Sequence, residues 1–332
     1  MSASRILTVW SGIDVAAWIL LGVVIDFLFG DLPWSYHPVR WICGLVDVLE
    51  KGSRVAFKTK WALRIAGSIL TLFVVLLVMA VVTGILAGAY QISPWLFRGL
   101  VVFLVFAGVS LRGVSDSALA IYVPLLGNHY DDARYHLAMM SGHDTSHWSN
   151  HDIVRGTIET VAGNTCYGIV GPLFYGFLGG PVWLWGYKTV HTLNAMIGKT
   201  LPQYYDLGWF AKNLDRLFNW IPARLTSWSI LLAAGLEGRF RDAYQVMRED
   251  GHHHPLPNQG LSEAAMAGAL GVGLGGANSY GGVVALKPRI GNPERPLVPR
   301  TIVHAVTISI RATLILIIGF TLISVMWTGR WL

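Results

Sequence analysis

The longest uncharged run of the chain constrains its fold most strongly. Residues 65–97 form a stretch of 33 positions without a single Asp, Glu, Lys or Arg. The apolar core of a bilayer is crossed by a helix of about 20 residues, so this run is long enough to cross a membrane and turn back near Pro94. Charged residues make up only 13% of the 332 positions, about half their usual share in soluble domains. This composition excludes an ordinary soluble enzyme and a disordered chain.

Several further segments are apolar, and they differ in how regular they are. The predicted transmembrane helices are residues 9–29, 65–90, 95–111 and 312–329. Gly, Pro or a short length interrupts three more apolar segments, residues 160–187, 225–236 and 264–286. Irregular backbone survives at membrane depth only where protein or water covers it, so we expect re-entrant or protein-packed helical segments there. The predicted fold is an all-α polytopic membrane protein with a single domain over residues 1–332.

The distribution of basic residues predicts the orientation. Residues 37–64 carry six Lys and Arg, whereas the turn near Pro94 carries none. Cytoplasmic loops are enriched in Lys and Arg, so we expect this loop, and the polar stretches 112–159 and 188–311, on the cytoplasmic side of an inner membrane. The net charge of +6 is too dilute for a nucleic-acid-binding stripe; membrane lipid is the expected partner, and no nucleic acid. Cys43 and Cys166 are expected to be free thiols in this reducing compartment.

The first cluster of polar residues lies where the predicted first helix ends. It consists of Asp26, Asp31, His37 and Arg40. A carboxylate inside the membrane is costly and is a candidate functional residue by default. An equally good interpretation is a helix end capped by Asp31, with Arg40 reaching the headgroups.

The second cluster begins with the sequence GHDT at residues 142–145 and continues with Arg155 and Glu159. The latter two are four residues apart and share a helical face. A helix N-terminus beside a cation suits a phosphate group. Taken alone, the pattern favours a capped surface helix with one ion pair.

Weaker signals come from Lys188, from histidines and from glycines. Lys188 closes a long uncharged segment and is either an anion partner or a membrane-surface anchor. His143, His147 and His151 are spaced by four, which would place them on one helical face, and a structural metal there is the minority interpretation. Residues 271–276 fit GxGxxG, but no strand precedes them and no acidic residue follows at the required distance, so a dinucleotide site is rejected. Anion binding by the Gly-rich turn and close helix packing both stay open.

Longer motifs occur in a fixed order along the chain. They are DFLFGDLPWSYHPVRW at residues 26–41, GHDT at 142–145, RGTIETVAGNTCYGIVGPLF at 155–174, YKTVHTLNAMIG at 187–198, NWIPARLT at 219–226, SEAAMAGALGVGLGGANSYGG at 262–282, and Pro288. In order and spacing this set resembles the CbiB/CobD family of cobalamin biosynthesis, the membrane-embedded adenosylcobinamide-phosphate synthases. The resemblance covers nearly the whole chain, which makes it far more specific than any single motif.

The resemblance implies a reaction and the groups that it needs. It implies that a carboxylate of adenosylcobyric acid is joined to an amino-alcohol phosphate, with ATP and Mg²⁺ activating the acid. Corrinoid and amino-alcohol phosphate are then the substrates, and a homo-oligomer or a membrane complex is a further expected partner. By chemical type, the expected catalytic groups are Asp144, Glu159 and Glu263, with Asp144 and Glu159 also as Mg²⁺ ligands. The expected substrate and phosphate ligands are Arg40, Thr145, Arg155, Asn164, Lys188, Arg224, Ser262 and Asn278.

The chain departs from the family pattern at several acidic positions. It has His143 for an Arg, Gly163 for a Glu and Tyr167 for an Asp, and His191, Asn194 and Ala195 stand in a motif that usually reads VNTLDSM. Of a usual Asp pair before the Asn-x2-Pro-Ala-Arg stretch, Asp215 stays and Arg216 replaces its neighbour. If the missing carboxylates hold Mg²⁺ in the family, this chain is expected to bind it weakly. A synthase is the leading hypothesis. The alternatives are a diverged paralogue that acts as a regulatory or accessory membrane subunit, similar to the AmpE group, and, last, a transporter.

Overall fold

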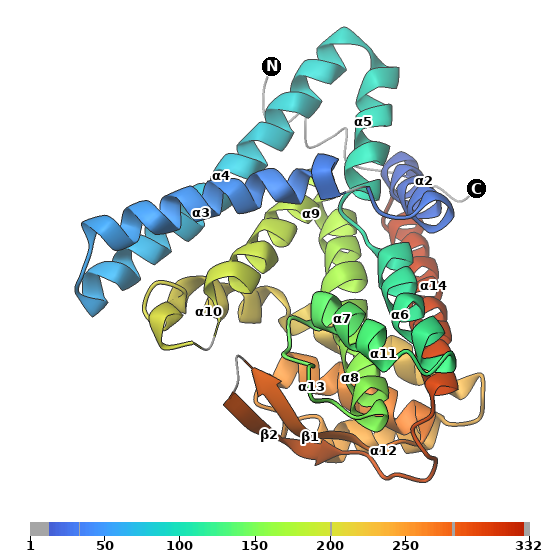
Figure 1. The fold of residues 1–332 in the computed structure, drawn as a ribbon. Coiled ribbons are helices and arrows are strands. Elements are labelled where there is room, and N and C mark those ends of the chain that lie inside the picture. The colour runs from blue at the N-terminus through green and yellow to red at the C-terminus, as the bar shows by residue number, and fades with distance from the viewer. Residues whose placement is uncertain (1–12, 33, 200, 281–282, 329–332) are drawn as a thin grey trace. The chain divides into compact units, whose positions relative to one another are not determined.

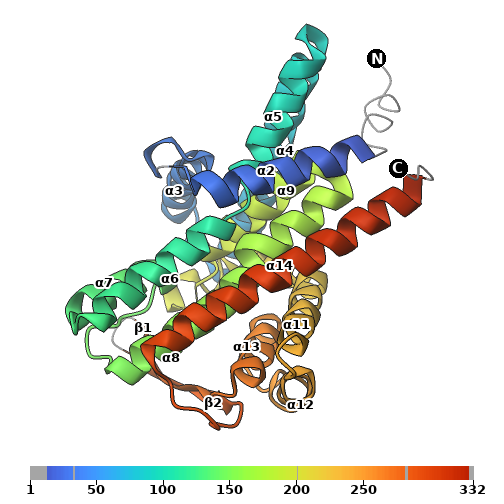
Figure 2. The same ribbon diagram turned by 90° about the vertical axis from the view of Figure 1, so that its right-hand side faces the viewer.

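The computed structural model describes residues 13–32, 34–199, 201–280 and 283–328, and it is almost entirely helical (Figures 1 and 2). The chain forms two compact units. Unit 1 comprises residues 1–110, 171–220 and 320–332, and unit 2 comprises residues 111–170 and 221–319. Each unit is therefore assembled from separate stretches of the chain. Whether the chain is one domain, as the sequence predicts, stays a prediction.

Unit 1 contains the most apolar helices. Its elements are α2 (Ile13–Phe29), η1 (Trp34–Tyr36), α3 (Pro38–Ala56), α4 (Lys60–Ile92), α5 (Pro94–Phe106), α9 (Gly171–Ile197), η3 (Pro202–Tyr204) and α10 (Trp209–Phe218). Helix α4 packs against α3, α5, α9 and α10 (Figure 1). Ser93 ends α4 and caps α5, because its side chain accepts a hydrogen bond from the Trp95 N–H and Pro94 occupies the first turn of α5. Proline is suited to that position because it needs no hydrogen-bond donor there.

Four helical stretches of the described chain are long and apolar enough to cross a membrane. They are Lys60–Ile92, Pro94–Leu126, Asn150–Ile197 and Pro299–Ser324, and Ala16–Phe29 is a shorter apolar helix. The predicted spans 65–90, 95–111 and 312–329 overlap three of these stretches, and residues 9–12 and 329 of the predicted spans lie outside the described part. The apolar helices fit the predicted multi-pass membrane protein.

The segment 160–187 contains the irregular backbone that its glycines led us to expect. Residues Thr165–Val170 form a π-helical turn. Within α9, Gly180 adopts a φ of 66° immediately before Pro181, which bends the helix. A left-handed φ favours glycine, and proline removes a helical hydrogen bond.

Unit 2 is built around helix α8 and contains the hairpin of the chain. Its elements are α6 (Leu111–Leu126), α7 (Tyr130–Ser141), α8 (Asn150–Asn164), η2 (Thr165–Val170), α11 (Trp220–Gly235), α12 (Phe240–Asp250), α13 (Pro257–Leu270), β1 (Leu274–Tyr280), β2 (Val283–Ile290) and the first part of α14 (Pro299–Thr328). Helix α8 packs against α6, α7 and α13, and α12 lies beside α13 (Figure 2). The predicted short segment 225–236 lies largely within α11.

The segment 264–286 departs from the expectation of a helical segment. Helix α13 ends at Leu270, because Gly271 takes a left-handed φ of 69°. The chain then forms the antiparallel hairpin of β1 and β2, with an irregular register between Leu274 and Gly276. Gly275 and Gly276 have φ of 81° and 102°, conformations that other residues rarely adopt. An uncharged, glycine-rich composition is shared by packed membrane helices and by a bulged hairpin, so composition did not distinguish them.

Close packing at Gly67 of α4 generates a stability prediction. A Cβ atom at Gly67 would lie 1.8 Å from the Leu207 carbonyl oxygen, whereas one at Gly84, further along the same helix, would meet nothing within 4 Å. Overpacking of this kind costs about 1–3 kcal/mol. We expect Gly67→Ala to lower the Tm of the purified protein in detergent by several degrees and Gly84→Ala to leave it nearly unchanged. Equal Tm values for the two variants would contradict the close approach of α4 to Leu207.

Candidate functional site

The candidate site is built on two buried side chains of α8. Helix α8 starts with a capping box, in which Ser149 and Asp152 satisfy each other's backbone N–H groups. One turn later Arg155 and Glu159 lie on the same face, with Arg155 Nε 3.8 Å from Glu159 Oε1. The Glu159 side chain is only 2% exposed. A buried carboxylate without compensating partners would be strongly destabilising, so its partners determine what the site does.

The β-hairpin supplies those partners. The Gly275 N–H donates to Glu159 Oε1 at 2.8 Å, and Lys287 Nζ on β2 donates to Glu159 Oε2 at 3.2 Å. Arg155 in turn donates to the Gly275 carbonyl at 2.5 Å. Residues more than 100 positions apart in the sequence thus form one charged cluster in unit 2. We call Arg155, Glu159, Glu263, Lys287 and His254 the buried cluster.

Glu263 of α13 is the second carboxylate of the buried cluster. It is completely buried, and its Oε1 accepts a hydrogen bond from Gln259 Nε2 at 2.6 Å. Lys287 Nζ lies 3.9 Å from the same oxygen, further than from Glu159. Burial, reinforced by the negative charge of Glu159, raises the pKa of Glu263 to about 8. At neutral pH this carboxyl group therefore holds a proton.

His254 faces the other oxygen of Glu263. Its Nε2 lies 3.5 Å from Glu263 Oε2, and neither atom has a hydrogen-bond partner in the described part of the chain. His254 Nδ1 lies 3.0 Å from both the N–H and the carbonyl oxygen of Leu256, and these contacts hold the ring in place. Burial, and then the positive charge of Lys287, lowers the pKa of His254 to about 4. At neutral pH the pair is therefore a protonated carboxyl group beside a neutral imidazole.

The loop with the sequence GHDT connects the buried cluster to the surface. It lines a pocket of about 360 Å³ together with Asp131, Arg134 and Tyr135 of α7. The His143 ring lies 5.7 Å from the Trp148 ring, and the Arg155 guanidinium lies 5.7 Å from the same ring. Burial, and then the positive charge of Lys287, lowers the pKa of His143 to about 4. His143 thus lines the pocket as a neutral side chain and lies close enough to the buried cluster to sense the charges of Lys287, Glu159 and Arg155.

The other two polar residues of this loop have local hydrogen bonds. The Ser146 hydroxyl and N–H donate to Asp144 Oδ1, and these bonds lower the pKa of Asp144. The Thr145 hydroxyl donates to the Arg134 carbonyl at 2.7 Å, which attaches the loop to α7. Asp144 lines the pocket, whereas the hydroxyl of the predicted ligand Thr145 has a structural hydrogen bond.

Four other predicted site residues lie on α8, α11, α13 and β1 of unit 2. Ser262 donates to the Gln259 carbonyl, one turn away on α13. Asn164 and Arg224 lie on α8 and α11 of unit 2, half-buried. Asn278 belongs to β1, but its side chain lies outside the described part of the structure.

The predicted histidine stripe does not form one helical face. His147 lies in a turn before α8 begins, and His147 and His151 are both exposed, unlike His143. No group of three or more His, Cys, Asp or Glu is arranged for a metal ion among the residues that the structure describes. Both Glu159 oxygens bind the hairpin, so the predicted pairing of Asp144 with Glu159 around Mg²⁺ finds no support in the geometry.

In unit 1 the predicted N-terminal cluster gathers around Lys188. Lys188 Nζ donates to the Gly108 carbonyl at 3.1 Å and interacts electrostatically with Asp31 and the buried Asp26. His37 caps α3 by accepting the Val39 N–H, and burial followed by the charge of Lys188 lowers the pKa of His37. Arg40 is exposed on α3. Asp31, His37 and Lys188 therefore form a mixed polar group in this unit.

Two residues at which the expected family pattern is not followed, His191 and Asn194, lie around Asp215 in unit 1. Asn194 donates to Asp215 Oδ2 at 2.7 Å, and His191 Nδ1 lies 3.1 Å from Asp215 Oδ1. Asn219 donates to Asp215 Oδ1 at 2.9 Å and accepts from the Tyr187 hydroxyl at 2.7 Å. His191, Asn194 and Asn219 thus hold the Asp215 carboxylate in place.

Comparison with known proteins identifies the family of this chain. The family described as CobD/Cbib protein matches residues 19–309. The cobalamin biosynthesis protein CobD of Yersinia enterocolitica is 35% identical over 317 residues, covering 95% of this chain and 99% of that relative. This chain belongs to the CobD/CbiB family. A CobD protein of Geobacter metallireducens is 38% identical over 86% of this chain and 89% of its own length. The cobalamin biosynthesis protein CbiB of Salmonella paratyphi B is 38% identical over 85% of this chain and 89% of its own. No solved structure matches.

Two members of the buried cluster were missed by the sequence analysis of this CobD/CbiB protein. Lys287 directly follows the uncharged segment 264–286, as Lys188 follows the segment 160–187, and it directly precedes Pro288 of the family motifs. That position was a usable signal. His254 belongs to a tract of three histidines before a proline, and nothing local distinguishes it from its two exposed neighbours.

The raised pKa of Glu263 predicts a dependence of stability on pH. Its ordinary pKa is 4.5 and its folded value about 8, so between these values the folded state binds a proton that the unfolded chain has released. Stability is therefore lost as the pH rises through this window. Glu263→Gln, which mimics the protonated acid, is expected to gain Tm relative to the wild type as the pH rises from 6 to 8. The exposed Glu249→Gln is the control, and parallel curves for Glu263→Gln and the wild type would refute the protonated buried acid.

Proposed function

We propose that this chain is a membrane-bound synthase of cobalamin biosynthesis that joins adenosylcobyric acid to an amino-alcohol phosphate. The observation that carries the proposal is the buried cluster, in which two cations and a protonated carboxyl group surround one paired carboxylate. Membership of the CobD/CbiB family, whose named relatives are cobalamin biosynthesis proteins, supports the pathway.

Each member of the buried cluster has a role that suits amide formation. With Glu263 protonated, the two cations Arg155 and Lys287 face a single ionised carboxylate, Glu159. The cluster therefore has an excess of positive charge and attracts anionic groups such as a phosphate or a substrate carboxylate. Glu263, which holds a proton at neutral pH, can give that proton to the departing phosphate and, once ionised, take up the proton that the attacking amine loses. The neutral ring of His254 faces Glu263 Oε2 at 3.5 Å. The neutral His143 excludes water and a competing charge from the entrance.

ATP as the activating substrate would bring Mg²⁺ with its phosphates, and such Mg²⁺ commonly takes only one or two protein carboxylates. Asp144 fits this requirement, because it lines the 360 Å³ pocket and no protein group is bonded to its Oδ2 among the described contacts. Glu159 does not fit while Lys287 and Gly275 hold both of its oxygens. Asp144 is thus the residue that we propose for Mg²⁺, and phosphate activation is the chemistry that the metal would supply.

The membrane arrangement completes the proposal. We propose that the loops of unit 2 face the cytoplasm from the inner membrane, where ATP is present, on the basis of the basic loop 37–64. A homo-oligomer or a membrane complex remains our expectation for the partner. Among the predicted phosphate ligands, Arg155 has the position that best supports that role.

The direct test is an assay of the purified protein in detergent with adenosylcobyric acid, aminopropanol phosphate, ATP and Mg²⁺, and the amide product detected by mass spectrometry. We expect wild-type turnover, and a fall of at least 100-fold for Lys287→Met and for Glu159→Gln, because each leaves a buried charge unpaired in the site. Glu249→Gln is the matched control on the exposed face of α12. Variants are compared only where their Tm shows that they are folded.

A diverged paralogue that binds without turnover is the second candidate, because the amide of Asn194 donates to Asp215 at the position where the expected family pattern has an acid. The same preparation distinguishes the two. Corrinoid binding, followed by its visible absorbance, without product would favour the paralogue. No binding and no product, beside an active CbiB relative, would exclude the synthase.

A further inference from the structure

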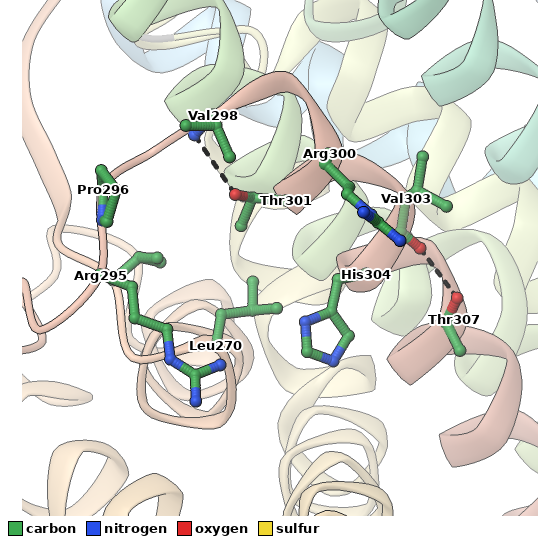
Figure 3. A pocket seen from close by; sticks show the side chains of 10 residues that line it. Leu270, Arg295, Pro296, Val298, Arg300, Thr301, Val303, His304 and Thr307 are labelled. Carbon is green, nitrogen blue, oxygen red and sulfur yellow. Dashed lines mark hydrogen bonds between the residues drawn. The ribbon is translucent and has the colours of Figure 1, made fainter.

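A second pocket of unit 2 lies apart from the residues of the buried cluster. It has a volume of about 520 Å³ and is bounded by the end of α13, the segment before α14 and the first turns of α14 (Figure 3). Leu270 and Val272 form one wall, and Arg295, which precedes α14, lies across from Arg300 and His304 of α14. None of these residues belongs to the site proposed above.

The charges of this pocket are unbalanced. Of the carboxylates that the structure describes, none lies within ion-pair distance of Arg295 or Arg300. Two acids next to this pocket already have partners: Glu294, which precedes Arg295, binds Arg239 at 2.8 Å, and Glu237 binds the lining residue His304 at 2.7 Å and also Arg311. The walls therefore present two uncompensated guanidinium groups next to an apolar surface of Leu270, Val272 and Val303.

The position of the pocket indicates the class of ligand. Residues Pro299–Ser324 are long and apolar enough to cross a membrane, so the pocket lies at the end of a candidate span, where a helix that crosses a bilayer meets the lipid phosphates. A guanidinium group pairs with phosphate oxygens through two parallel hydrogen bonds. Two such groups beside an apolar wall fit an organic phosphate, whose charged head and carbon body would each find a matching surface.

We propose that this pocket binds the phosphate group of an organic phosphate ester, held by Arg295 and Arg300. The phosphate comes either from an anionic phospholipid of the surrounding bilayer or from a soluble phosphate ester. The site does not depend on the proposed synthase activity, because it shares no residue with the buried cluster. Both arginines are exposed, so they can be replaced without disturbing the core.

The test compares the wild type with the double variant Arg295→Gln/Arg300→Gln. The control is Arg241→Gln/Arg248→Gln, which removes two exposed arginines of α12. In one arm, protein in detergent is titrated with glycerol 3-phosphate and the binding heat is measured. In the other arm, protein is placed in nanodiscs of phosphatidylcholine with or without phosphatidylglycerol, and the retained lipid is identified by native mass spectrometry.

We expect one arm to respond for the wild type and the control, with affinity or lipid retention at least tenfold lower for Arg295→Gln/Arg300→Gln, since each lost charged hydrogen bond costs about a factor of ten or more. A response to glycerol 3-phosphate identifies a soluble ligand, and selective retention of phosphatidylglycerol identifies a lipid site. Equal behaviour of the double variant and the wild type in both arms, with unchanged Tm, would overturn the proposal.

Discussion

The ion pair between Lys287 and Glu159 is the interaction on which unit 2 depends. Removing two charges from water costs several kcal/mol per ion, and these side chains are 8% and 2% exposed. The cost is offset only because the Gly275 N–H occupies the other Glu159 oxygen and Arg155 binds the Gly275 carbonyl. The hairpin and α8 therefore stabilise each other's buried groups. Neither can be repositioned without leaving a charge or a backbone donor unsatisfied, and this rigidity is what a preorganised site requires.

One lysine shared by two carboxylates creates a division of roles. Lys287 Nζ is 3.2 Å from Glu159 and 3.9 Å from Glu263. Its positive charge therefore stabilises a negative charge on Glu159 more than one on Glu263. Glu263 receives instead a neutral hydrogen bond from Gln259 and the neutral ring of His254 as its neighbour. Two carboxyl groups in different environments, one paired and one protonated, are the arrangement by which enzymes obtain an acid and an anion at the same pH. The division arises from packing alone and needs no bound ligand.

Sequence patterns predicted the parts of this protein that depend on local composition. The uncharged run at residues 65–97 predicted a helix that turns back near Pro94, and α4 and α5 meet there at Ser93. The family motifs pointed to Arg155, Glu159 and Glu263 as candidate site residues. The hairpin was not predicted, because glycine-rich uncharged sequence suits a packed helix and a bulged hairpin equally. Lys287 was missed for a related reason, since its partner Glu159 is 128 residues away. The predicted alignment of the histidines on one helical face was wrong, because His147 precedes the helix that contains His151. Long-range pairing and helix starts are set by tertiary contacts that periodicity does not contain.

The departures from the family pattern fit the same electrostatic balance. At position 194, an amide in place of an acid donates to Asp215, so a pair of adjacent carboxylates becomes a neutral hydrogen bond. At position 163, a side chain would begin 3.5 Å from the amide of Gln259, which is the group that holds Glu263. A third acid there would place another negative charge beside Glu263, with Lys287 already divided between two carboxylates. Glycine at this position keeps the acids of unit 2 in balance with Arg155 and Lys287. The buried cluster thus contains one carboxylate with both oxygens hydrogen-bonded, Glu159, and one protonated carboxyl group, Glu263, whose Oε2 faces His254.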